Sequence, residues 1–222
     1  MRPIIVISII VVGISFVQGC KRAGEPVEAK VYAPKPVDQL HVDWAELESK
    51  VCNNALLQQQ LERFKKRHGI AEGMASTEDS LKQAYGMLSD PSAKVSAAVD
   101  TLQLFGELGT QEVVHQGLLH RHWAVVGQAA TIILKQSDQG VKDKGALPYL
   151  FYFMAKNNDD RPGNGETTSV KRTVLLAIQR ITNLDIELSE TDVDNTQKVE
   201  EVLSMARNWA NQKGIKLFEE NK

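Results

Sequence analysis

The feature that most constrains this fold is an apolar helix pattern that occurs three times in the sequence. Each copy fills positions i, i+3, i+4 and i+7, which lie on one face of a helix. The second copy begins 31 residues after the first, and the third begins 44 residues after the second. The copies are Val95, Ala98, Val99 and Leu102; Val126, Ala129, Ala130 and Ile133; and Val170, Thr173, Val174 and Ala177. This recurrence predicts a repeat architecture, because short helical units bury their apolar faces by stacking on one another.

A second apolar stripe precedes each copy, so the sequence predicts three helix pairs. These stripes are Leu81, Ala84, Tyr85 and Leu88; Val114, Gly117 and Leu118; and Leu147, Leu150, Phe151 and Met154. A last stripe would close the open end of the stack as a cap, and it comprises Val199, Val202, Leu203, Ala206 and Trp209, ended by Gly214. The longer second interval matches the polar residues 156–169, which predict a loop inserted between two helices of one pair.

A long helix is predicted over residues 44–68, before the first pair. Asp43 and Glu46 have the spacing of a capping box, and Gly69 is a natural stop. The apolar spacing slips between Val51 and Leu57, so packing onto the rest of the domain is favoured over a coiled coil. The nearby Cys52 is interpreted as a small packing residue, with a reactive thiol as the alternative.

The repeats resemble a known family. The pattern of apolar helix, Asp-Pro turn and Val-x-x-Ala-Ala/Val-x-x-Leu is similar to HEAT repeats in "MLSDPSAKVSAAVDTL", in "LLHRHWAVVGQAATII" and in "SVKRTVLLAI", over residues 78–182. The second segment carries Arg121-His122 where the first has Asp-Pro. The resemblance implies an all-α fold, a short α-solenoid of about three HEAT-like helical hairpins with an N-terminal helix and a C-terminal capping helix. It also implies a surface that holds a protein partner.

The N-terminus has the order of a secretory signal: Arg2, an apolar stretch over residues 4–16, and then Gly19 before Cys20. The stretch is short for a spanning helix, which needs about 20 apolar residues. Val17-Gln18-Gly19-Cys20 resembles the bacterial lipobox. The resemblance implies cleavage after Gly19 and acylation of Cys20, with Lys21 favouring the outer membrane if the cell has two. An uncleaved anchor and an ordinary secreted protein remain as alternatives.

The remaining boundaries follow from composition. Residues 1–19 are assigned to the signal peptide, 20–41 to the lipidated cysteine and a flexible proline-containing tether, 42–214 to the helical domain and 215–222 to a tail. Extended residues 21–41 would reach roughly 60 Å from a bilayer. Cysteine usage agrees with this assignment, because Cys52 has no intramolecular partner if Cys20 is lipidated.

Composition argues against a nucleic-acid protein, because 26 basic and 28 acidic side chains leave a formal net charge of −2. No catalytic order of residues stands out, so a non-enzymatic protein without a cofactor is expected. Exposed aromatic residues are the favoured partner surface, although packing between repeats is an equal alternative. These residues are Trp123, Tyr149, Tyr152 and Phe153.

The sequence thus predicts a membrane-tethered scaffold or adaptor lipoprotein of the bacterial cell envelope, with its domain outside the cytoplasm and another envelope protein as its partner. The alternative is a metal- or small-ligand-handling envelope protein. It would use the turn that carries His115, His120 and His122, together with the loop 156–169. The histidine spacing is weak for a metal site, because ligands on one helical face are three or four residues apart. A permanent structural subunit of a larger complex is a third hypothesis, which the sequence does not separate from the first.

Overall fold

A computed structural model describes residues 32–70, 76–156 and 165–218, and these residues belong to one compact unit. The fold of the described residues is all-α: they form α-helices and short 3-10 helices and contain no strand. The α-helices are α1 Trp44–Cys52, α2 Ala55–His68, α3 Thr77–Ser89, α4 Val95–Glu107, α5 Gln111–Leu118, α6 Trp123–Asp138, α7 Leu147–Lys156, α8 Gly165–Thr182 and α9 Thr196–Gln212. The 3-10 helices are η1 Val37–Gln39, η2 Lys144–Ala146 and η3 Glu190–Asp194.

The helix predicted over residues 44–68 is two helices, so that prediction was wrong in one respect. Asp43 caps α1 as expected, by accepting the backbone N–H of Glu46 at 2.9 Å. The chain then breaks at residues 53–54, where the Asn54 side chain accepts the N–H groups of the first turn of α2. This cap satisfies donors that a continuous helix would bond internally. The break coincides with the slip in the apolar spacing between Val51 and Leu57.

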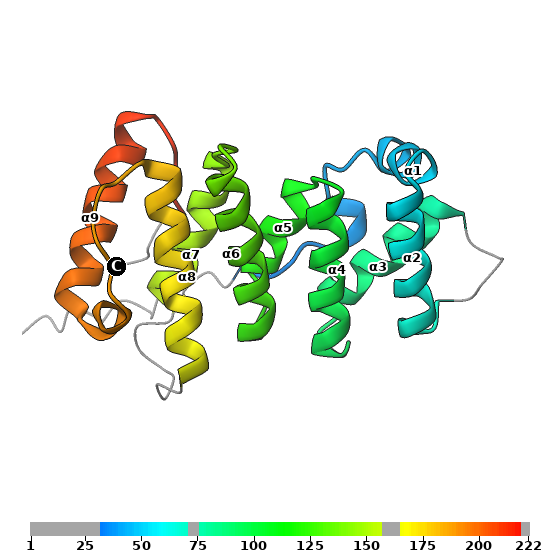
Figure 1. Ribbon diagram of the computed structural model, residues 1–222, viewed down its shortest axis with the longest axis horizontal. Coiled ribbons are helices and arrows are strands. Elements are labelled where there is room, and N and C mark those ends of the chain that lie inside the picture. The colour runs from blue at the N-terminus through cyan, green and yellow to red at the C-terminus, as the bar shows by residue number, and fades with distance from the viewer. Residues whose placement is uncertain (1–31, 71–75, 157–164, 219–222) are drawn as a thin grey trace, which may run out of the picture. The chain divides into compact units, whose positions relative to one another are not determined.

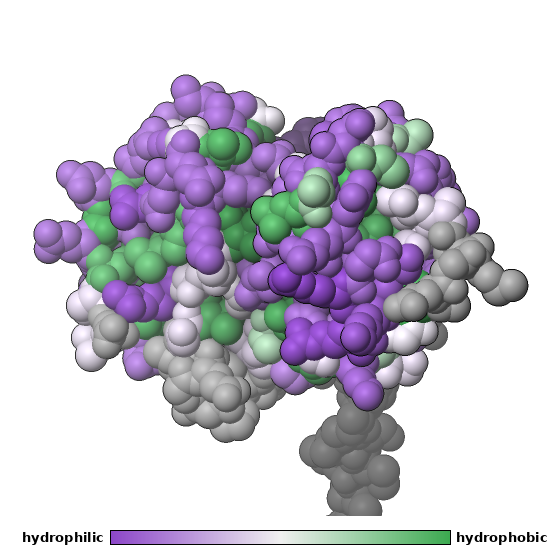
Figure 2. Space-filling view, turned by 45° about the vertical axis from the view of Figure 1, so that its right-hand side comes forward, coloured by the Kyte–Doolittle hydropathy of each residue, from purple (hydrophilic) through white to green (hydrophobic). Residues whose placement is uncertain are grey.

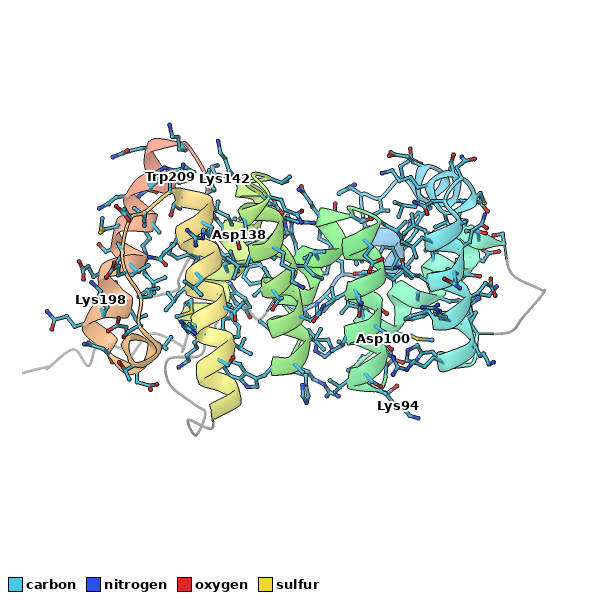
Figure 3. The ribbon with its side chains drawn as sticks, in the orientation of Figure 1. Lys94, Asp100, Asp138, Lys142, Lys198 and Trp209 are labelled. Carbon is cyan, nitrogen blue, oxygen red and sulfur yellow. The ribbon has the colours of Figure 1, made fainter. Side chains whose placement is uncertain are left out.

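The three predicted helix pairs are α3 with α4, α5 with α6, and α7 with α8. The two members of each pair contact one another, and the second members also contact in chain order, α4 against α6 and α6 against α8. Figure 1 shows α2, α4, α6 and α8 side by side, with α9 against α8. Ion pairs join neighbouring helices at the surface: Asp138 of α6 meets Arg180 of α8 at 3.1 Å (Figure 3).

The repeated apolar residues supply the core. All four residues of the second copy are buried, as are Ala98 and Leu102 of the first and Val174 and Ala177 of the third. Close approach of the helices depends on Gly117 in α5, where an added Cβ would lie 2.7 Å from Leu102 Cδ2. The last predicted stripe lies on α9, whose buried residues are Val199, Val202, Leu203, Ala206 and Ala210, whereas the predicted Trp209 is only partly buried.

Two local predictions were wrong. Helix α8 begins at Gly165, so the predicted loop 156–169 ends before its expected last residues, and residues 157–164 lie outside the described part of the chain. Cys52 is exposed rather than packed, because it lies at the end of α1 where the chain breaks; its Sγ is 4.0 Å from Thr77 Oγ1.

The exposed surface is mainly polar. Figure 2 shows hydrophilic residues over most of the face in view, with smaller groups of hydrophobic residues between them. Large hydrophobic side chains that are strongly exposed include Leu56, Val141 and Met205, which belong to three separate stretches of the chain. Within the described ranges, every helix is too short or too polar to cross a membrane.

Candidate functional site

The candidate site is a surface on α3, α5 and α7 that binds an extended part of the same chain. We call residues 32–41 the N-terminal segment and the side chains that hold it the segment-binding surface. These side chains are Tyr85, Glu112, Gln116 and Tyr152. The sequence assigned residues 32–41 to a free tether, and the structure instead places them against the first helix of each pair, where Figure 1 shows the segment in blue running past α5 toward α1.

The segment is held by hydrogen bonds between its backbone and side chains of the helices. The Tyr32 N–H donates to Tyr152 Oη on α7 at 3.0 Å, and the Lys35 N–H donates to Gln116 Oε1 on α5 at 2.9 Å. The Tyr85 hydroxyl on α3 donates to the Lys35 carbonyl oxygen at 2.5 Å. The first helix of each of the three pairs therefore contributes at least one hydrogen bond, and α5 contributes a second one through Glu112, which accepts the His41 N–H.

The backbone conformation of the segment agrees with the three-residue interval between its bound N–H groups, those of Tyr32 and Lys35. Pro34 and Pro36 flank Lys35, and Pro36 has φ −66° and ψ 160°, close to polyproline II. Polyproline II repeats every three residues and makes no internal hydrogen bonds, so backbone groups in this conformation remain available to the surface. After Pro36 the segment forms η1, in which the Gln39 N–H donates to the Pro36 carbonyl oxygen at 3.0 Å. Tyr32 and Lys35, whose N–H groups bind the surface, are three residues apart.

Charge reinforces the contact. The Lys35 ammonium lies 3.6 Å from Glu112 Oε1, and the His41 N–H approaches the same carboxylate oxygen at 3.4 Å. The Lys35 and Glu112 side chains are partly exposed, so their ion pair contributes little to stability. It fixes the position of the N-terminal segment along the helices instead. Leu40 is the buried anchor of the segment, at 9% exposure, and it joins the hydrophobic core.

The polar side chains beneath the segment are themselves deeply buried. Gln116 and Tyr85 are both 0% exposed, and the N-terminal segment supplies partners for the Gln116 Oε1 and Tyr85 Oη atoms. Burial raises the pKa of Tyr85 well above its ordinary value, and the Glu112 carboxylate adds to the shift. Tyr85 is therefore a neutral hydroxyl donor, which suits a carbonyl acceptor.

An aromatic cluster surrounds the start of the segment and joins it to the last described residues of the chain. The Tyr32 ring stacks on Phe218 with centroids 4.3 Å apart and meets Tyr152 edge-on at 5.0 Å. Tyr149 also meets Phe218 edge-on at 5.0 Å. Tyr149 and Tyr152 are two of the predicted partner residues. Tyr152 contacts residues from both ends of the described chain, Tyr32 and Phe218, whereas Tyr149 contacts Phe218. Burial raises the pKa of Tyr149.

The other two predicted aromatic residues lie elsewhere. Trp123 of α6 meets Phe153 of α7 edge-on at 5.1 Å, and Phe153 is buried at 5% exposure. The four aromatic residues thus divide into a cluster beside the N-terminal segment and a packing contact between α6 and α7. The alternative of packing between repeats applies to Phe153, because its side chain is covered in this structure.

The predicted histidine turn does not form a cluster. His115 Nε2 lies 2.5 Å from Asp143 Oδ2, and its ring stacks on Tyr149 at 5.0 Å. His120 and His122 instead use Nδ1 to accept backbone N–H groups within the turn, at 3.0 and 3.3 Å. Burial lowers the pKa of His120. Within the described ranges, no three His, Cys, Asp or Glu side chains are grouped as a metal ion would require.

A pocket of about 290 Å³ lies between α2 and α4. Asp100 points from α4 toward α2, where its carboxylate meets Arg67 and His68, each at 2.8 Å (Figure 3). This arrangement pairs the acid with two basic groups, so it fastens α2 to α4 and does not present a lone charge to a ligand.

Sequence reasoning missed the residues that shape the site most. Gln116 lies within an apolar helix stripe, and its buried polar side chain is visible only once the segment is placed. Tyr32 and Phe218 lie far apart in the sequence, so no local period connects them. Pro34-Lys35-Pro36 was the available signal, because proline on both sides of a residue favours polyproline II as well as a free linker. The predicted lipidation residue, Cys20, lies outside the described residues.

Comparisons with known proteins found no matching family model, no similar curated protein and no similar solved structure.

Proposed function

We propose that this protein is a membrane-tethered, non-enzymatic scaffold or adaptor, in which a HEAT-like α-solenoid binds another protein of the bacterial cell envelope. Support for a solenoid comes from the contacts of α3–α4, α5–α6 and α7–α8 within pairs and of α4, α6 and α8 between pairs. Support for anchoring comes from the lipobox-like residues 17–20. The acyl chains on Cys20 would hold the domain outside the cytoplasm, since two or more chains give stable anchoring.

The observation that carries the binding function is the array of hydrogen bonds from all three helix pairs to the backbone of the N-terminal segment. Tyr85, Gln116 and Tyr152 recognise peptide groups, a chemistry that any extended protein segment can satisfy. The side chains at this surface are two phenols, an amide and a carboxylate that pairs with Lys35.

In-situ crosslinking tests this function. A photoreactive residue is placed at the exposed Ala155 on α7, three residues after Tyr152, of the full-length protein in its own envelope, and captured chains are identified. We expect one dominant envelope protein, whose yield falls in the Gln116→Leu variant and persists in the matched control Gln103→Leu, an exposed position on α4. If both variants instead crosslinked to the same broad mixture of proteins with no dominant partner, the adaptor proposal would be overturned.

The anchoring proposal has a separate test. We expect Cys20→Ala to abolish acyl labelling and to leave the precursor uncleaved. Unchanged membrane retention and mobility of that variant would indicate a plain transmembrane anchor instead.

A further inference from the structure

We propose that the segment-binding surface is a site for a proline-containing polyproline II segment of the partner protein, and that the N-terminal segment occupies this site in cis as its competitor. The inference rests on the proposed adaptor function and names the chemistry of its ligand. The ligand has an aromatic residue, a basic residue three positions later and prolines on both sides of the basic residue. It must displace residues 32–36 to bind.

The first step of the argument is that recognition is directed at the peptide backbone. Tyr152 and Gln116 accept N–H groups, and Tyr85 donates to a carbonyl oxygen. These contacts do not depend on which side chain the bound residue carries. A segment of another protein in the same conformation would make all of them.

The second step is that two side-chain positions add selectivity. The aromatic ring of Tyr32 lies between Phe218 and Tyr152, and the Lys35 ammonium faces Glu112. An aromatic ring and a cation three residues apart match the three-residue turn of polyproline II. The surface therefore discriminates among extended segments by these two groups.

The third step is that the resident segment is held by few buried groups. Of residues 32–41, only Leu40 is buried, whereas Ala33, Pro36, Asp38, Gln39 and His41 are exposed. Segments with little buried apolar surface open at low free energy, independently of global unfolding. Residues 32–36 can therefore leave the surface while Leu40 and the helical core stay in place.

Exchange of this kind has a defined effect on affinity. An occupied site binds a second ligand with an apparent Kd raised by the reciprocal of its open fraction. Removing the resident contacts raises that fraction, so the Kd for an added peptide falls. Lys35→Pro is the sharpest change, because it deletes the N–H that Gln116 accepts and the charge that faces Glu112, yet it keeps a polyproline II backbone.

The experiment measures binding of a fluorescent peptide, YAPKPVDQLHV, to the purified full chain by anisotropy. We expect weak binding to the unmodified chain and a Kd lower by about tenfold or more for Lys35→Pro. Adding Gln116→Leu to that variant should abolish binding, whereas adding Gln103→Leu should not. The control peptide YAPPPVDQLHV should bind at least tenfold more weakly, because it lacks the same N–H group and cation.

A folded Lys35→Pro variant that binds no peptide would overturn the proposal, and so would equal affinities for that variant and the unmodified chain. A second measurement needs no variant. Excess unlabelled peptide should increase hydrogen exchange at the Tyr32 and Lys35 amides of the unmodified chain, and unchanged protection would also overturn exchange at this surface. If these peptide experiments fail but a single partner is still captured in situ, the adaptor proposal is retained and only the proposed peptide-binding site is rejected.

Discussion

Gly117→Ala tests the packing of the helix pairs directly. A Cβ at this position of α5 would lie 2.7 Å from Leu102 Cδ2 and 3.0 Å from Ala129 Cβ. Leu102 on α4 and Ala129 on α6 are both 0% exposed, so neither has free space to enter. Overpacking a core costs about 1–3 kcal/mol, whereas alanine in place of a helical glycine gains about 0.5–1 kcal/mol. We expect a net loss of about 1 kcal/mol.

Gly86→Ala is the matched control, because Gly86 lies within α3 and a Cβ there would have no heavy atom within 4 Å. We expect this variant to gain about 0.5–1 kcal/mol from the helix preference alone. The difference between the two variants isolates the packing cost, about 1–3 kcal/mol. For a domain of this size it corresponds to a difference in Tm of about 5 °C.

The assay is urea unfolding of both variants, followed by far-UV circular dichroism and analysed at constant m value. Equal stability of Gly117→Ala and Gly86→Ala would refute the reasoning, because it would mean that α5 does not approach α4 and α6 as closely as described. A loss well above 3 kcal/mol would instead indicate that the three helices cannot separate at all around this position.

Three further predictions concern single contacts. Tyr85→Phe should lower the free energy of unfolding by about 1 kcal/mol, because the Lys35 carbonyl loses its donor; urea unfolding measures the loss, and unchanged stability would contradict the bond. Asn54→Ala should cost about 1 kcal/mol through loss of the α2 cap, measured in the same way, whereas Gln59→Ala, at an exposed position within α2, serves as the control outside that cap. The exposed Cys52 thiol should react with a thiol reagent in the folded chain at a rate close to that in denaturant, and strong protection would contradict its exposure.

The helices could be predicted from the sequence because their apolar faces have a period. The stripes of α3, α6 and α7 match the buried residues, and Gly69 ends α2 with φ 72°, as the stop signal indicated. The break between α1 and α2 was visible only as a slip in that period. At residues 53–54, one continuous helix and two separate helices differ mainly by the two hydrogen bonds that the Asn54 side chain accepts. Local helix propensity does not distinguish these two alternatives.

The site was harder to predict because its ligand has no side-chain period. The backbone groups of a polyproline II segment form no hydrogen bonds within the segment. A proline-containing segment that binds a surface and one that serves as a free linker therefore have the same composition. Residues 32–41 therefore read as a tether, although three helix pairs hold them. The determinants are instead single buried polar atoms, Gln116 Oε1 and Tyr85 Oη, placed among apolar residues. A buried polar side chain on an otherwise apolar stripe requires a hydrogen-bonding partner, because leaving it unpaired costs about 1–3 kcal/mol. In this chain the partner of both atoms is the Lys35 backbone, so the two buried side chains favour a backbone peptide group at this place.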